Sequence, residues 1–192
     1  DEVITGFRIG MGGAQAKYDV RPDITCFGKV IGGGLPIGAI GGSRAVMENL
    51  SPLGKVFHAG TLAGNPLATA AGLSALNELT QDVYMELGAR ARQLATLLRD
   101  ACTSAGITAQ FPVVGTLVGA FFGSRVPTNF DEAKQTDEKM YAKFFHAMLN
   151  EGVAMAPGAY EALFVGVGHT DAVMEQLAAA AHRAAHAVAT AK

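Results

Sequence analysis

The chain has 192 residues, 49% of them hydrophobic, which is enough for one large or two small globular domains. Its 15 basic and 17 acidic residues nearly cancel, so the charge balance predicts neither nucleic-acid binding nor attraction to an anionic membrane surface. No apolar stretch approaches the roughly 20 residues that span a bilayer, and there is no secretory leader, so we expect a cytoplasmic protein. Cys26 and Cys102 match neither a metal site nor a disulfide framework, and we expect both to be buried.

The first 45 residues consist of short apolar segments interrupted by glycines. The chain begins without methionine, at the polar end of a predicted strand over 1–8, and we therefore expect a fragment of a longer protein. Val20–Asp23 is typical of a turn, and strands are predicted over 24–27 and 39–43 on either side of a glycine-rich loop.

Two helices are predicted in the middle of the chain. Over 65–79 the apolar residues recur at helical spacing, with Asn65 suited to the N-cap and Pro66 to the first turn. A second helix is predicted over 83–105 and ends at Gly106.

The pattern after Gly106 is that of a small α/β or α+β domain. The sequence thus predicts an α/β protein with a first domain over 1–80, a connecting helix over 81–105 and a small carboxy-terminal domain over 106–192. The elements expected in the last part are strands over 107–111, 116–122 and 163–167, a helix over 136–151, and a helix from Asp171 to the end.

Lys29 is the residue that most strongly indicates chemistry. It is the single cation in the apolar run 23–38 and is followed by Gly32, Gly33 and Gly34. Loss of hydration would disfavour its ammonium form and leave a neutral amine that can attack a carbonyl, and the glycines would let a ligand approach closely. The alternative is a lysine whose stem lies on an apolar strand while its ammonium reaches water.

The run 23–38 does not match the sequence pattern of a nucleotide-binding loop. A phosphate-binding loop needs glycine six residues before the lysine and Ser or Thr after it, where this chain has Asp23 and Val30. The spacing of Gly32, Gly34 and Ile37 also fails to complete a dinucleotide-binding fingerprint.

Several motifs occur in order along the chain. Three of them are Asp1-Glu2-Val3 with Gly6-Phe7-Arg8, Phe27-Gly28-Lys29 with Gly32–Gly38, and Gly60–Pro66. Together they resemble the class III aminotransferases of the fold-type I pyridoxal-phosphate enzymes.

Shorter motifs are Gly12–Ala16, Ala59–Leu62, and Ala156-Pro157 followed by Tyr160-Glu161-Ala162. They resemble the aminomutases of that family, which move an amino group within one substrate. The resemblance covers nearly the whole chain and the carboxy-terminal half of the family, so 1–80 would be part of the cofactor-binding large domain.

The resemblance implies that pyridoxal 5'-phosphate is the cofactor. It implies that Lys29 binds the cofactor covalently and moves protons on the substrate, which agrees with the nucleophilic amine argued above. Asp1 would pair with the pyridine nitrogen and keep it protonated, so that the ring accepts electrons. Val3 would pack on one face of the ring, although a β-branched residue in a strand is usually core.

Other implied contacts involve a second subunit and the substrate. Gly60 and Thr61 would bind the cofactor phosphate of the neighbouring subunit in a homodimer, whereas without the resemblance they are an ordinary turn before a helix. Glu161 would lie near the substrate end of the pocket and orient the amino group of a small amino-acid aldehyde, although a surface glutamate is the simpler interpretation. The histidines have no ligand spacing, so no metal is expected.

Two alternatives remain open on the sequence alone. One is a class III aminotransferase with a separate amino donor and acceptor. The other is a fragment without activity that binds a partner through exposed apolar surface.

Overall fold

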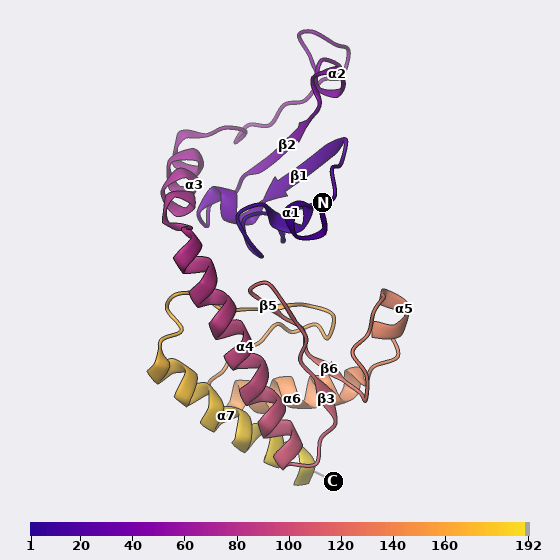
Figure 1. Ribbon diagram of the computed structural model, residues 1–192, viewed down its shortest axis with the longest axis vertical. Coiled ribbons are helices and arrows are strands. Elements are labelled where there is room, and N and C mark those ends of the chain that lie inside the picture. Colours follow the sequence, from indigo (N-terminus) through magenta and orange to yellow (C-terminus); the bar gives the residue numbers. More distant parts are fainter. Residues whose placement is uncertain (191–192) are drawn as a thin grey trace. The chain divides into compact units, whose positions relative to one another are not determined.

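The computed structural model describes residues 1–190 and divides into two compact units, Asp1–Tyr84 and Met85–Lys192 (Figure 1). In the first unit, strand β1 (Ile24–Gly28) pairs antiparallel with strand β2 (Gly38–Gly42), and all five residues of each strand are in register. The predicted strands over 24–27 and 39–43 are thereby confirmed. The unit also contains α1 (Gly13–Tyr18), the 3-10 helix η1 (Lys29–Gly32), α2 (Arg44–Met47) and α3 (Pro66–Glu78).

Helix α3 begins as its sequence predicts. The Asn65 side chain accepts a hydrogen bond of 2.9 Å from the backbone N–H of Ala68, and Pro66 occupies the first turn, where no intrahelical donor is needed. The helix packs against η1, so the glycine-rich segment after β1 is held from one side by α3.

The predicted strand over 1–8 is wrong, because this segment forms hydrogen-bonded turns. The backbone N–H of Gly6 donates to the carbonyl of Glu2, and that of Ile9 donates to the carbonyl of Thr5. The Glu2 carboxylate also bonds to the Thr5 hydroxyl, three residues away. These local partners satisfy the groups that a strand would present to a neighbouring strand.

The second unit joins three long helices to short antiparallel strands (Figure 1). Its core contains Phe111, Phe144 and Met148, all fully buried, and Phe144 packs on Phe122 with ring centroids 5.5 Å apart. The elements are α4 (Gln81–Ser104, beginning before Tyr84), β3 (Ala109–Gln110), β4 (Val113–Val114), β5 (Leu117–Val118), β6 (Phe121–Phe122), α5 (Phe130–Ala133), α6 (Glu138–Asn150), β7 (Leu163–Phe164) and α7 (Asp171–Thr190).

The long helices follow the prediction closely, whereas the strands are shorter. The expected strand over 116–122 is two strands. The N–H of Gly119 donates to the carbonyl of Pro112, but Pro112 has no N–H to return a bond, so the ladder is interrupted there. β5 pairs with β4 and β7, and β6 pairs with β3. No helix among residues 1–190 is long and apolar enough to cross a membrane.

The two cysteines differ in environment. Cys102 is buried in α4, as expected, and burial raises the pKa of its thiol to about 12. Cys26 is exposed on β1, which corrects the expectation that it is buried. Position 26 lies in a strand that has one partner strand and an open cleft beside it.

Candidate active site

Lys29 is the first residue of η1 and directly follows the last residue of β1. Its φ of 51° lies in the left-handed region, which costs a residue with a side chain about 1 kcal/mol and is found more often at functional sites than elsewhere. The strand end and the turn of η1 together fix where this side chain leaves the backbone.

The expectation that apolar residues enclose Lys29 is wrong for the described residues, because the Lys29 side chain is exposed. The lysine turns out of the strand into a shallow depression instead of continuing along an apolar sheet face. The other residues that line this depression are Val30, Gly34, Leu35, Pro36 and Ile37.

The segment from Asp1 to Val3 lies beside β1. The Asp1 carboxylate accepts a hydrogen bond of 2.8 Å from the backbone N–H of Val3, and the N–H of Glu2 donates to the carbonyl of Cys26. A Cβ atom placed on Gly28 would lie 3.3 Å from Cγ1 of Val3, so the valine side chain contacts the residue before Lys29. The structure thus brings Val3 beside the backbone that carries Lys29.

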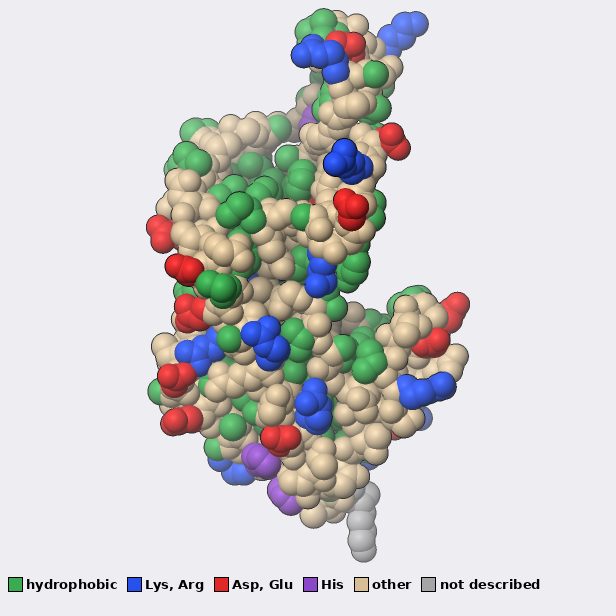
Figure 2. Space-filling model, in the orientation of Figure 1, with side chains coloured by type: hydrophobic (Ala, Val, Ile, Leu, Met, Phe, Trp, Pro, Cys, Tyr) green, Lys and Arg blue, Asp and Glu red, His purple; other side chains and the backbone are tan. Residues whose placement is uncertain are grey.

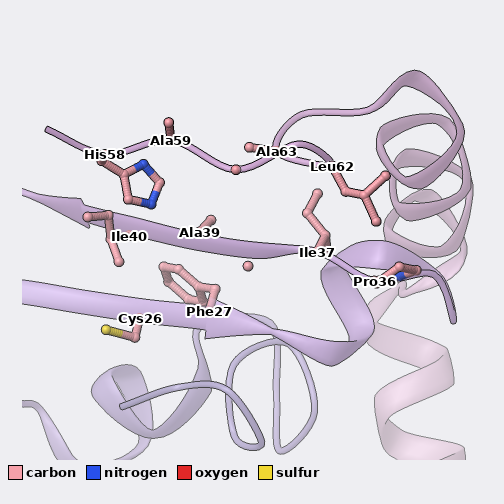
Figure 3. Close-up of a pocket in the computed structure, with 12 residues that line it drawn as sticks. Cys26, Phe27, Pro36, Ile37, Ala39, Ile40, His58, Ala59, Leu62 and Ala63 are labelled. Atoms are coloured by element: carbon pink, nitrogen blue, oxygen red, sulfur yellow. The ribbon is translucent and has the colours of Figure 1, made fainter. Parts of the chain in front are cut away.

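Gly60 borders an open cleft of about 650 Å³ in the first unit (Figure 3). The segment that contains His58, Ala59, Leu62 and Ala63 runs beside β2 in the view of Figure 3. The cleft shares Pro36 and Ile37 with the depression at Lys29, so the two hollows are adjacent. The remaining lining residues are Cys26, Phe27, Gly38, Ala39 and Ile40.

Thr61 is exposed and lies in the turn that precedes α3, but it does not line the cleft. The turn is closed by a hydrogen bond of 3.0 Å from the N–H of Ala63 to the carbonyl of Gly60. His58 and Phe27 do line the cleft, and our sequence reasoning gave neither a site role. The closeness of these two residues to Gly60 and Lys29 in the chain was the available signal.

Glu161 belongs to the second unit, where it closes a turn with Gly158. Its Oε1 accepts a hydrogen bond of 3.2 Å from the N–H of Gly158, and a Cβ atom at position 158 would lie 2.7 Å from the same oxygen. The carboxylate can fold back onto this turn because residue 158 is glycine. Glu161 also borders a cavity of about 420 Å³ within the second unit.

The chemistry of Lys29, Asp1, Gly60 and Thr61 fits pyridoxal phosphate. An exposed amine suits an aldehyde, the Asp1 carboxylate suits a protonated pyridine nitrogen, and the backbone and hydroxyl donors of Gly60 and Thr61 suit a phosphate. The cleft volume falls within the range of roughly 300–1,000 Å³ that is usual for small-molecule sites. Within residues 1–190, no group of three His, Cys, Asp or Glu side chains is arranged to hold a metal ion.

Comparison with known families identifies the class of protein. The model of the class-III aminotransferase family matches residues 1–181, and this chain belongs to that family. It is 50% identical over 172 residues to the glutamate-1-semialdehyde 2,1-aminomutase of Desulfosudis oleivorans and 48% identical over 190 residues to that of Desulforamulus reducens. These matches cover 89% and 98% of the chain, which spans 40% and 44% of the length of those relatives.

Solved structures agree on the fold. An omega-transaminase from Sphaerobacter thermophilus superimposes with a TM-score of 0.82 at 30% identity, over 96% of this chain and 43% of that one. A variant of the glutamate-1-semialdehyde-aminomutase from Pseudomonas aeruginosa, solved in complex with PMP, gives 0.80 at 25% identity over the same shares. The expectation of a partial fold-type I chain of class III is therefore confirmed.

Proposed function

We propose that the protein carrying this sequence is a pyridoxal-phosphate-dependent aminomutase that converts glutamate-1-semialdehyde to 5-aminolevulinate for tetrapyrrole synthesis. The observation that carries the proposal is the 50% identity over 172 residues to an enzyme of that name. Two contacts support it: the Val3 side chain lies against Gly28, the residue before Lys29, and the Asp1 carboxylate accepts a hydrogen bond from the Val3 N–H.

Each of these three residues would have a separate task. Lys29 would bind the aldehyde of the cofactor and later carry protons between the two carbons that exchange the amino group. The Asp1 carboxylate would keep the pyridine nitrogen protonated, and the Val3 side chain would hold one face of the ring. When bound, the cofactor supplies an electron sink that stabilises negative charge on the substrate carbon.

Substrate and product are isomers, so the reaction needs no second substrate. Over the full reaction the aldehyde carbon gains an amino group and a proton, the neighbouring carbon loses an amino group and a proton, and Lys29 would act as acid and base in these proton movements. Glu161 would orient the substrate's amino group, and its turn with Gly158 holds the carboxylate in place within the second unit.

We further propose a homodimer with the cofactor site at the subunit interface, where Gly60 and Thr61 bind the phosphate of the partner. Large apolar side chains on both sides of this turn support the proposal, since Phe57 is 81% exposed and Leu67 is 74% exposed. Figure 2 shows exposed hydrophobic side chains in the half of the view that holds α3.

Two free cysteines agree with a cytoplasmic location, because reducing compartments keep thiols unpaired.

We also propose the domain boundaries that the sequence predicts. Residues 1–80 would be the carboxy-terminal part of the cofactor-binding large domain, 81–105 a connecting helix, and 106–192 the small domain. Limited proteolysis tests these boundaries, since a cut just before α4 would leave that helix, whose Leu94 and Leu98 are buried, with the second unit and release two folded pieces.

The decisive experiment is reduction with borohydride in the presence of pyridoxal phosphate, followed by peptide mass mapping. A pyridoxyl group on Lys29 supports the proposal, and labelling of other lysines with Lys29 unmodified would contradict it. Lys29→Ala should abolish both the label and turnover. Lys17→Ala is the matched control, because Lys17 lies in the same unit on α1 and is exposed.

A class III aminotransferase with a separate amino donor is the second candidate, which the similarity to the omega-transaminase favours. The two candidates differ in what they consume. Turnover of glutamate-1-semialdehyde as the sole substrate supports the aminomutase, whereas an absolute requirement for an added amino donor and keto acceptor would replace it with the aminotransferase.

A further inference from the structure

Glu2 is a buried carboxylate between the two residues that we assign to the cofactor ring. Its side chain is 3% exposed, and it is one of two buried polar or charged residues among the described ones. Glutamate is almost never buried unless its oxygens are paired, so its partners require an explanation.

Both carboxylate oxygens of Glu2 accept hydrogen bonds. Oε1 accepts one of 2.8 Å from the backbone N–H of Gln15, and Oε2 accepts one of 3.0 Å from the N–H of Ala14 and another from the Thr5 hydroxyl. The backbone of Glu2 is also hydrogen-bonded. Its N–H donates to the carbonyl of Cys26, and its carbonyl accepts from the N–H of Gly6. Glu2 is thus joined to α1 through its side chain and to β1 through its backbone.

The Gly12–Ala16 motif provides the cradle for this carboxylate. A Cβ atom on Gly13 would lie 2.6 Å from Oε2 of Glu2, and Gly13 has a φ of 61°, so glycine is needed there for two reasons. Gln15 extends the connection, because its side-chain oxygen accepts a hydrogen bond of 3.3 Å from the Thr25 hydroxyl on β1. The motif that resembles the aminomutases therefore has a physical task outside the cofactor contacts.

We propose that Glu2 is a positioning residue, whose carboxylate, held by Ala14, Gln15 and Thr5, fixes Asp1 and Val3 in the geometry that the cofactor ring requires. The inference rests on the proposed function, because it assigns Asp1 and Val3 to the ring. Asp1 is exposed and its carboxylate bonds to the N–H of Val3, so the backbone on either side of Glu2 sets where that carboxylate lies.

Glu2→Gln tests the inference with little change in volume. The amide keeps one oxygen but presents an NH₂ group to a backbone N–H that previously met a carboxylate oxygen, which leaves a buried donor unsatisfied. We expect the dissociation constant for pyridoxal phosphate to rise about tenfold, since hydrogen bonds to a buried charge are the strong ones. Glu78→Gln is the matched control, because Glu78 is exposed on α3 in the same unit.

Two readouts do not depend on turnover. In the cofactor-free protein, amide hydrogen exchange at Ala14, Gln15 and Val3 should become faster in Glu2→Gln and stay unchanged in Glu78→Gln. In the loaded protein, the pH midpoint of the cofactor's visible absorption should shift in Glu2→Gln, since that midpoint reports the charge placed near the pyridine nitrogen.

Thr5→Val serves as a second variant in case Glu2→Gln does not fold. It keeps the carboxylate and removes the hydroxyl donor, and we expect a rise in the dissociation constant of about threefold. An unchanged dissociation constant and absorption midpoint in folded variants, with a lower melting temperature alone, would show a purely structural role and overturn the inference. If the unmodified protein is not labelled at Lys29, the proposed function fails instead, and the exchange at Ala14 and Gln15 still reports whether Glu2 holds the segment.

Discussion

Gly72 of α3 lies against the backbone of Ile31 in η1. A Cβ atom placed on Gly72 would lie 1.9 Å from the Ile31 carbonyl oxygen, a separation that no pair of non-bonded atoms can occupy. The helix and the turn that follows Lys29 can therefore pack together because residue 72 has no side chain.

Gly72→Ala should separate α3 from η1. Overpacking typically costs 1–3 kcal/mol, and here the obstacle is backbone, so we expect a loss of about 2 kcal/mol in the free energy of unfolding despite the better helix propensity of alanine. Urea denaturation measures the loss, and weaker labelling of Lys29 should accompany it. Ser74→Ala, on an exposed position of the same helix, should change the free energy by less than about 0.5 kcal/mol. Equal stability of the two variants would contradict the packing.

Glu2 makes the stability of the first unit depend on pH at the acid end. Burial raises the pKa of this carboxyl, but the hydrogen bonds from Thr5, Ala14 and Gln15 outweigh burial and hold the pKa below its ordinary value. A carboxyl whose pKa is lower in the folded state stabilises the fold above its unfolded pKa and loses that contribution as the pH falls.

Unfolding in urea at several pH values tests this dependence. We expect the free energy of unfolding to be steady above about pH 5 and to fall below about pH 4.3, the usual value for glutamate. Glu2→Gln should be less stable than the parent at pH 7, with a weaker fall below pH 4.3. A variant whose pH profile runs parallel to that of the parent would mean that Glu2 does not carry this part of the dependence.

Met148 and Leu149 are neighbours on α6 with opposite environments, being 1% and 48% exposed. Truncating a buried methionine leaves a cavity, so Met148→Ala should cost about 2–5 kcal/mol in the second unit. Leu149→Ala removes a similar volume from the surface and should cost less than about 1 kcal/mol. Thermal or urea unfolding distinguishes the two variants. Similar losses of stability in both would mean that α6 does not turn Met148 toward the core and Leu149 toward solvent.

Local signals made much of the fold predictable. Asn65 and Pro66 predicted the start of α3 because capping depends on a few adjacent residues, and Gly106 marked the end of α4 for the same reason. The turns over 1–8 were not predictable in this way, since the Glu2 carboxylate finds two of its partners at Ala14 and Gln15, twelve and thirteen residues away.

In the candidate site, too, the features that depend on adjacent residues were predictable, and those that depend on distant contacts were not. Lys29 could be located from its motif, but its exposure could not, because apolar neighbours in sequence are not neighbours in space once the chain turns out of β1. Val3 beside Gly28 and Gly60 beside the cleft depend on contacts between distant segments. The role of Glu2 was missed because a glutamate in a predicted strand is usually solvated.

The two cysteines offer a chemical test of the fold that needs no cofactor. Cys102 is buried with a pKa of about 12, so at pH 8 only roughly one molecule in 10,000 carries the thiolate that reacts with an alkylating reagent. Cys26 is exposed at the cleft, where reagent has access. We expect iodoacetamide to modify one thiol rapidly in the native chain and both thiols in urea, with Cys26 identified by mass mapping. Cys26→Ser should abolish the rapid reaction without affecting labelling of Cys102 in urea. Rapid modification of Cys102 in the native chain would show that α4 does not bury this side chain.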